Sequence, residues 1–205
     1  MLSQERVPVA VLVSGNGSNL EQLLLAQEEG RLPDGELVLV IANRAGAYAL
    51  TRAENHGVAA RLIPHQGRSR EEFEAQLQAA LSQARVKLIV LAGFLRILSG
   101  DFVARWPGRI INIHPALLPN FGGPGMHGLA VHQAVLDSGE KCSGATVHIV
   151  TEETDGGPVL LQKQVAVAAG DTAQDLQQRV LQQAEWVILP QAVQLMCRRI
   201  REETT

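Results

Sequence analysis

Cysteine is scarce in this chain, and its two cysteines, Cys142 and Cys197, lie far apart in 205 residues. They match neither a disulfide framework nor a metal-binding pair, which points to a reducing, cytoplasmic compartment. Charge of one sign is also lacking: the formal net charge is −3 and no basic stripe is present, so no nucleic-acid partner is expected. Because no apolar run approaches about 18 residues, we expect a soluble chain without a membrane partner.

The sequence does contain short Val- and Ile-rich runs that alternate with longer stretches of helical periodicity. This pattern is typical of a parallel sheet covered by helices, and the chain is long enough to bury one such core. Strands are expected at Val7–Val13, Glu36–Ala42, Ala59–Ile63, Lys87–Ala92 and Arg109–Ile113. Helices are expected at Ser18–Glu29, Ala47–His56, Ser69–Ala84 and Ser99–Arg105.

The second half of the chain has a different pattern. Two expected strands, Ala145–Val150 and Pro158–Val167, follow each other with only a turn between them, which predicts a hairpin or a mixed sheet edge. A last helix is expected from Thr172 to Arg199, with Asp171 as its N-cap and a kink or break at Pro190.

Glycine and small polar residues make up the segment Ser14–Asn19, which follows the first expected strand. Such a segment lets backbone N–H groups approach an anion, and a helix N-terminus adds partial positive charge, so a phosphate is a natural ligand. The segment is neither a complete dinucleotide fingerprint nor a Walker loop, since Leu20 replaces the third glycine and no lysine follows. A plain turn with Ser18 or Asn19 capping the helix explains it equally well.

Asn112 and His114 stand at the end of an expected buried strand. Period-two alternation places both side chains on one face, where an amide donor and an imidazole can bracket one carbonyl oxygen. Open α/β sheets bind their ligands at this end of their strands. The alternative is a satisfied polar pair that closes the strand.

Asp155 belongs to an Asp-Gly-Gly-Pro segment between the last two expected strands, and taken alone it is an ordinary turn residue. A carboxylate beside His114 would instead favour the imidazolium, raise its pKa and accept a proton directly or through water. No metal is expected, because the remaining candidates share no metal-ligand spacing: His127, His132 and His148.

Four segments, taken in order, resemble the phosphoribosylglycinamide formyltransferase family: VLVSGNGSNL, AGFLRILS, INIHPALLP and GATVHIVTEETDGGPVLLQ. The resemblance runs from Val9 to Pro190. Segments like the last two recur in other folate formyl-transfer enzymes, whereas the GNGSNL start and the short length select this family. The resemblance implies the formyltransferase fold, an α/β, Rossmann-like and mostly parallel sheet with helices on both faces and mixed, antiparallel strands in the C-terminal half.

The resemblance also implies site residues. Those that match the catalytic residues are Asn112, His114 and Asp155. Those that match the contacts to glycinamide ribonucleotide are Gly17, Ser18 and Asn19 at its phosphate, with Gln182 and Glu185. Those that match the surroundings of 10-formyltetrahydrofolate are Arg70, Leu95, Arg96, Ile97, Leu98, Asn112 and Val150.

The implied protein is an enzyme with one formyltransferase domain over residues 1–205, made of a mononucleotide-binding half (1–108) and a catalytic, folate-binding half (109–205). It would transfer the formyl group of 10-formyltetrahydrofolate to the amine of 5′-phosphoribosylglycinamide in purine biosynthesis, through a tetrahedral intermediate and without a metal. The family also implies a homodimer. The alternatives are a formyltetrahydrofolate hydrolase or a tRNA formyltransferase fragment, both disfavoured because no extra domain is expected, and a non-catalytic nucleotide-binding module.

The chain departs from the common family pattern after LLP. Asn120–Gly128 is longer and richer in glycine than the usual stretch, so no folate contact is transferred to it, and roles for His127 and His132 stay open. The wider stretch Pro115–Met126 is rich in proline and glycine, which predicts a mobile loop. Closure of this loop over folate would exclude water, and that role stays open.

Overall fold

The computed structural model describes residues 5–203, and within that range seven strands form one hydrogen-bonded sheet in the order β3-β2-β1-β4-β5-β6-β7. The strands are β1 (Val7–Val13), β2 (Gly35–Ala42), β3 (Ala59–Leu62), β4 (Leu88–Leu91), β5 (Ile110–His114), β6 (Cys142–Ile149) and β7 (Val159–Ala166). β1 pairs in parallel with β2 and β4, as β2 does with β3, whereas β6 is antiparallel to β5 and β7. This mixed α/β sheet confirms the expected fold class.

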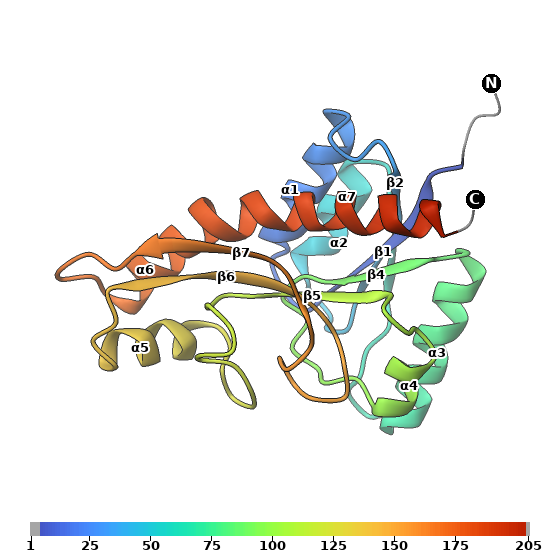
Figure 1. Ribbon diagram of the computed structural model, residues 1–205. Coiled ribbons are helices and arrows are strands. Elements are labelled where there is room, and N and C mark those ends of the chain that lie inside the picture. Colours follow the sequence, from blue (N-terminus) through green and yellow to red (C-terminus); the bar gives the residue numbers. More distant parts are fainter. Residues whose placement is uncertain (1–4, 204–205) are drawn as a thin grey trace. The chain divides into compact units, whose positions relative to one another are not determined.

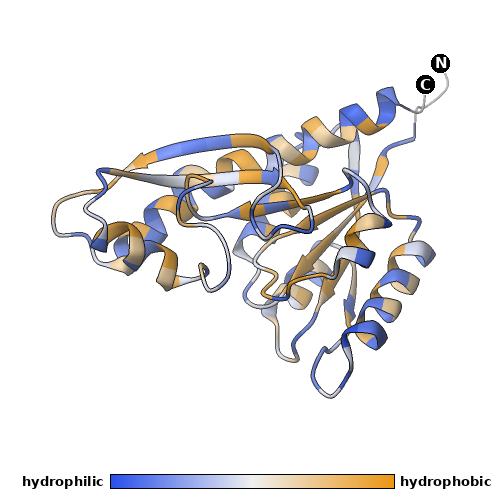
Figure 2. Ribbon diagram, turned by 60° about the horizontal axis from the view of Figure 1, so that its bottom comes forward, coloured by the Kyte–Doolittle hydropathy of each residue, from blue (hydrophilic) through white to orange (hydrophobic). Residues whose placement is uncertain are grey.

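The first compact unit contains the chain up to Ile110 and the segment from Val193 onward. Its connecting helices are α1 (Ser18–Glu28), α2 (Tyr48–Asn55), α3 (Arg70–Gln83) and α4 (Gly100–Ala104). The strand order reverses between β3 and β4, so right-handed crossovers place α1 and α2 on one face and α3 on the other. Figure 2 shows the parallel strands as mostly hydrophobic and the helices as mixed, which is the pattern of strands buried on both faces.

The second compact unit runs from Ile111 to Ala192. In it β6 and β7 form a long hairpin, and α5 (Leu129–Asp137) packs against α6 (Ala173–Val180) (Figure 1). β7 ends the strand order, and its hydrophilic middle, residues 162–164, is visible in Figure 2. Helix α5 is absent from the sequence-based expectation, because its short helical pattern directly follows a stretch rich in proline and glycine.

The expected last helix needs two corrections. Its N-cap is Thr172, because the Thr172 hydroxyl accepts the backbone N–H of Asp175 and the Asp175 carboxylate accepts that of Thr172. Asp171 instead pairs with Arg179. The expected break at Pro190 is absent, because Pro190 lies inside α7 (Trp186–Glu202). The regular α-helix is instead interrupted by the π-helical turn η1 (Leu181–Glu185).

The compact units are defined by contacts, so the division into functional halves at residue 108 stays a prediction. Within residues 5–203, no helix combines the length and the apolar character needed to cross a bilayer.

Candidate active site

Polar side chains gather on one face of the β5–β6 pair. Asn112 lies opposite His148 in the antiparallel register, and His114 lies opposite Thr146. Directly opposed residues point to the same face of a sheet, so all four side chains share that face. His114, Thr146 and His148 are buried, at 4%, 0% and 2% exposure. Asn112 and His114 therefore share one face, as their period-two spacing predicts, and β6 adds the side chains of Thr146 and His148.

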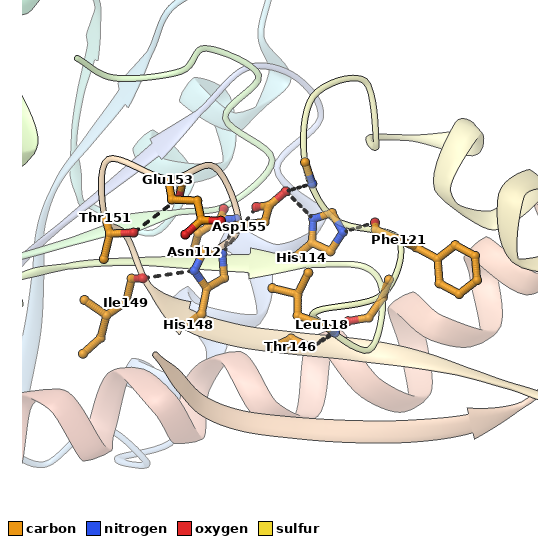
Figure 3. Close-up of polar contacts among 12 residues, drawn as sticks. Asn112, His114, Leu118, Phe121, Thr146, His148, Ile149, Thr151, Glu153 and Asp155 are labelled. Carbon is orange, nitrogen blue, oxygen red and sulfur yellow. Dashed lines mark hydrogen bonds and ion pairs between the residues drawn. The ribbon is translucent and has the colours of Figure 1, made fainter. Parts of the chain in front are cut away.

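Asp155 reaches this face from the turn between β6 and β7. Its Oδ2 lies 3.6 Å from Nδ1 of His114, and its Oδ1 lies 3.5 Å from Nε2 of His148. Figure 3 shows the carboxylate between the two imidazoles, with Asn112 beside them. The structure thus brings together the three residues that match the catalytic set, Asn112, His114 and Asp155; their roles stay predictions.

Asp155 raises the pKa of His114 as expected, but the net shift is downward, so the expected imidazolium is not favoured. Burial, which disfavours the charged imidazolium, lowers the pKa of His114 below its ordinary value of 6.5. The Asp155 charge and the Phe121 carbonyl act in the opposite direction but do not outweigh burial. Nε2 lies 2.8 Å from the Phe121 oxygen, which can only accept, so neutral His114 carries its proton on Nε2.

The pKa of Asp155 lies below its ordinary value of 3.8, so the side chain is a carboxylate at neutral pH. Burial alone would raise this pKa. The contact with His148, the backbone N–H of Gly123 and the charges of the two imidazoles together lower it. Gly123 N donates to Oδ2 at 2.9 Å. The site therefore holds a partly buried base beside a neutral imidazole.

His148 and Thr146 are the two residues on this face for which the sequence predicted no role. Nδ1 of His148 lies 3.1 Å from the Ile149 carbonyl oxygen, which assigns the proton to Nδ1 in the neutral ring. Nε2 then accepts from the Asn112 amide at 3.2 Å. His148 was considered only as a metal ligand. Its two-residue spacing from Thr146 on β6 places both polar side chains on one face of the sheet, and this was the signal that could have found it.

His132 is a further buried histidine, on α5. It is 1% exposed, and its Nδ1 has no hydrogen-bond partner among the described residues. Burial lowers the pKa of His132 to about 4, and the charge of His114 contributes in the same direction. His132 is therefore neutral at pH 7. By contrast, His127 is exposed.

The segment after β5 is fastened to the β6–β7 hairpin. The Thr146 hydroxyl donates to Ala116 O at 2.6 Å and accepts the Leu118 N–H at 3.1 Å. Gln162 Nε2 donates to Thr146 Oγ1 at 2.8 Å and to Leu118 O at 3.0 Å. Further along, a Cβ at Gly122 would lie 2.7 Å from a Leu118 methyl, so a larger residue there would require the Leu118 side chain to move. Mobility of residues 115–126 stays a prediction.

The expected phosphate segment lies in the first compact unit, between β1 and α1. Gly17 is the N-cap of α1, with a left-handed φ of 76° and no side-chain capping hydrogen bond. The alternative in which Ser18 or Asn19 caps the helix is therefore wrong, since both stand inside its first turn. The first N–H groups of a helix have no partner within the helix, so those of α1 are potential donors to an anion.

The segment that matches the folate surroundings also lies in this unit, between β4 and α4. Leu95 and Ile97 are 49% and 54% exposed, an apolar surface of the kind that a flat ring system can cover. Between them, Arg96 lies 5.2 Å from the Phe73 ring centre. Leu98 is buried, and Arg70 is exposed at the start of α3.

The remaining expected contacts lie in the second unit. Val150 follows β6 and is half-buried. Gln182 is exposed and Glu185 is buried, and both lie in the π-helical turn η1. No group of three His, Cys, Asp or Glu side chains among the described residues is arranged to hold a metal ion.

Comparisons with known proteins agree on one family. The family model described as Formyl transferase matches residues 7–193. The phosphoribosylglycinamide formyltransferase of Escherichia coli K12 is 42% identical over 183 residues, covering 89% of this chain and 83% of that protein. The structure of glycinamide ribonucleotide transformylase 1 from Symbiobacterium toebii matches with a TM-score of 0.89 and 39% identity, covering 96% of this chain and 93% of that one.

Longer relatives are matched over a small part of their length. The trifunctional purine biosynthetic protein adenosine-3 of Gallus gallus is 44% identical over 196 residues, which is 95% of this chain. The chain spans 19% of that protein and 14% to 18% of its counterparts in two Drosophila species, cattle and humans.

Proposed function

This chain belongs to the formyl transferase family, and we propose on that basis that it transfers the formyl group of 10-formyltetrahydrofolate to the amine of 5′-phosphoribosylglycinamide, a step of purine biosynthesis. The observation that carries the proposal is the cluster of Asn112, His114 and Asp155 at the end of β5. The names of the similar proteins, from Escherichia coli and Symbiobacterium toebii, support the choice of substrates. A cytoplasmic enzyme is part of the same proposal.

The reaction needs hydrogen-bond donors for a developing oxyanion. The substrate amine attacks the formyl carbon, a new C–N bond forms, and the bond from that carbon to the folate nitrogen breaks. One N–H of the Asn112 amide donates to His148, and we assign the other to the formyl oxygen. The Nε2–H of His114 is the second donor, once the formyl oxygen replaces the Phe121 carbonyl as its acceptor.

The reaction also moves one proton. The attacking amine must lose a proton, and the departing folate nitrogen must gain one. Asp155 is a carboxylate at neutral pH, so it can accept the proton, directly or through water, and pass it on. Nδ1 of the neutral His114 lies 3.6 Å from this carboxylate, so Asp155 would stabilise any positive charge that develops on the imidazole as its Nε2–H donates to the oxyanion. Neither a metal nor a covalent enzyme intermediate is part of this proposal.

Substrate binding is assigned to the residues that match the family. Gly17, Ser18 and Asn19 would hold the phosphate through backbone N–H groups at the start of α1. Gln182 and Glu185 would contact the rest of that substrate. The exposed apolar side chains of Leu95 and Ile97 fit the flat ring of the formyl donor, with Arg70, Arg96, Leu98, Asn112 and Val150 as its further contacts.

The test incubates the purified protein with both substrates and measures formylated amine, free formate and released tetrahydrofolate. We expect formylated amine in equal amount to released tetrahydrofolate. Asn112→Ala should lower kcat by about 10²- to 10³-fold, because it removes one oxyanion donor. The matched control is Asn55→Ala at the exposed end of α2, which should keep the wild-type kcat.

Three outcomes are informative. Free formate without formylated amine would mean a hydrolase, and binding without turnover would mean a nucleotide-binding module. Near-normal kcat in Asn112→Ala would remove the proposed mechanism but leave the reaction standing.

A further inference from the structure

The loop between β1 and α1 is held on both of its sides. On one side, the Ser14 hydroxyl accepts the Leu95 backbone N–H at 2.9 Å, and Ser14 N donates to Gly93 O at 3.0 Å. On the other side, the first turn of α2 reaches the loop, where Ala49 N donates to Gly15 O at 3.2 Å. A Cβ at Gly17 would lie 2.7 Å from the Ala49 Cβ, so α2 packs directly on the loop.

Arg52, one turn further along α2, forms hydrogen bonds with Asn16 in the exposed part of this loop. Its Nε donates to the Asn16 carbonyl oxygen at 2.9 Å, and its NH2 group donates to Asn16 Oδ1, also at 2.9 Å. This is a two-pronged contact in which a planar guanidinium holds both the backbone and the side chain of one residue. Gly15 and Asn16 are exposed, so packing contributes little to their position.

Two neighbours hold the guanidinium in this orientation. The Arg52 NH1 group donates to Glu21 Oε2 at 2.8 Å, and the guanidinium carbon lies 4.9 Å from the centre of the Tyr48 ring. The side chains of Arg52 and Glu21 are 23% and 25% exposed, so solvent screens this pair only in part. Burial alone would raise the pKa of Glu21, but Arg52 and His56 lower it, so Glu21 is charged at neutral pH.

Glu21 stands in the first turn of α1, where its charge would repel an anion bound at the helix N-terminus. Arg52 compensates that charge while it holds the loop. Both effects favour phosphate binding at Gly17–Asn19: the contacts with Asn16 fix the geometry of the loop, and the contact with Glu21 reduces the repulsion of the anion.

We propose that Arg52 is a positioning residue that holds the Asn16–Ser18 loop ready for the phosphate of the amine substrate. Its function is to fix Asn16 and to offset Glu21, without itself touching the reacting atoms. The inference rests on the proposed function, because that function supplies the phosphorylated substrate.

The test is a steady-state kinetic comparison of Arg52→Gln with the wild type. We expect KM for the phosphorylated amine to rise on the order of 10-fold, the equivalent of about one charged hydrogen bond. kcat and KM for the formyl donor should stay within about twofold of wild type, since the β5 cluster is untouched. Arg52→Lys should recover only part of the loss, because an ammonium cannot make the two-pronged contact.

A substrate without the phosphate distinguishes loss of phosphate binding from a general loss of activity. With the dephosphorylated riboside as substrate, Arg52→Gln and wild type should have the same kcat/KM. The matched control is Arg31→Gln, which removes an exposed arginine that pairs with Glu29 outside this network and should leave all parameters unchanged. Thermal unfolding of each variant establishes that the comparison is between folded proteins.

A second variant keeps the test decisive if Arg52→Gln does not fold. Asn16→Ala removes only the exposed amide acceptor, and it should raise the same KM by a smaller factor. An unchanged KM in both folded variants, or an equal loss with the dephosphorylated substrate, overturns the role of Arg52. A wild type that forms no formylated amine overturns the proposed function instead, so the two failures are distinguishable.

Discussion

At the residue scale, burial decides the charge states of the histidines around β5. His114 lies close to a carboxylate, yet its pKa is lowered, because loss of hydration outweighs the nearby charge. A neutral imidazole with one N–H still serves as an oxyanion donor. The groups that contact Asp155 keep it ionised. The different surroundings of the two side chains therefore leave His114 neutral, as a hydrogen-bond donor, and Asp155 charged, as a base.

His132 provides a prediction for stability as a function of pH. Its pKa is about 4 in the folded protein and about 6.5 when unfolded, so the unfolded chain binds the proton more readily. The free energy of unfolding should therefore fall as pH drops from about 6.5 towards 4. The full contribution of this one group is about 3 kcal/mol.

The measurement is urea unfolding of the wild type and of His132→Leu at several pH values between 4 and 7.5. The difference between the two proteins isolates this histidine from the other titrating groups. We expect the wild type to lose more stability than the variant at low pH. Parallel pH curves would contradict the buried, neutral state of His132.

At the element scale, the β6–β7 hairpin positions the chain that follows His114. Thr146 on β6 and Gln162 on β7 together form hydrogen bonds with three backbone groups of this chain segment: Ala116 O, Leu118 N–H and Leu118 O. Gln162 also donates to the Thr146 hydroxyl. Since Thr146 is fully buried, water cannot replace these hydrogen bonds. The hairpin is thus part of the support for the proposed catalytic cluster as well as part of the sheet.

Thr146→Val tests this support. The change keeps the side-chain shape but leaves Leu118 N–H without its acceptor and Ala116 O without its donor. We expect the free energy of unfolding to fall by about 1–3 kcal/mol, and kcat to fall with it as His114 loses its support. Equilibrium denaturation and the formylation assay measure the two effects.

Thr151→Val is the matched control for this change. The Thr151 hydroxyl is exposed and makes one long contact, 3.3 Å to Glu153 O. A stability change within about 0.5 kcal/mol is expected there. Equal losses in the two variants would show that burial of the Thr146 hydroxyl has no special weight.

At the scale of the whole molecule, the family resemblance predicts a homodimer that forms through the early part of the sheet. β3 is an edge strand of that region, and its Leu62 is 41% exposed. An exposed edge strand with an apolar side chain is a common pairing surface. Light scattering after size exclusion should give twice the 22.1 kDa mass of one chain. A single-chain mass at all concentrations tested would rule the dimer out.

The strand predictions show which parts of the fold could be predicted. β1 was expected at Val7–Val13 and lies there, whereas β2 and β3 differ from expectation by one residue at one end, and β4 and β5 by one residue at both ends. Strands buried on both faces appear in a sequence as unbroken apolar runs, which can be recognised without knowledge of the tertiary structure. Helix α5 was missed because its nine residues lack such a clear pattern.

The sequence alone determined the order of the strands and of the helices other than α5, the family, and the three residue types of the proposed catalytic set, because these depend on local patterns and motifs. Only the tertiary structure decided that His148 opposes Asn112, that Arg52 holds Asn16, and that His114 has a lowered pKa. Register, contacts across 36 residues of chain and loss of hydration arise from packing between distant segments. No local pattern encodes them, because each depends on which groups the folded chain excludes from water.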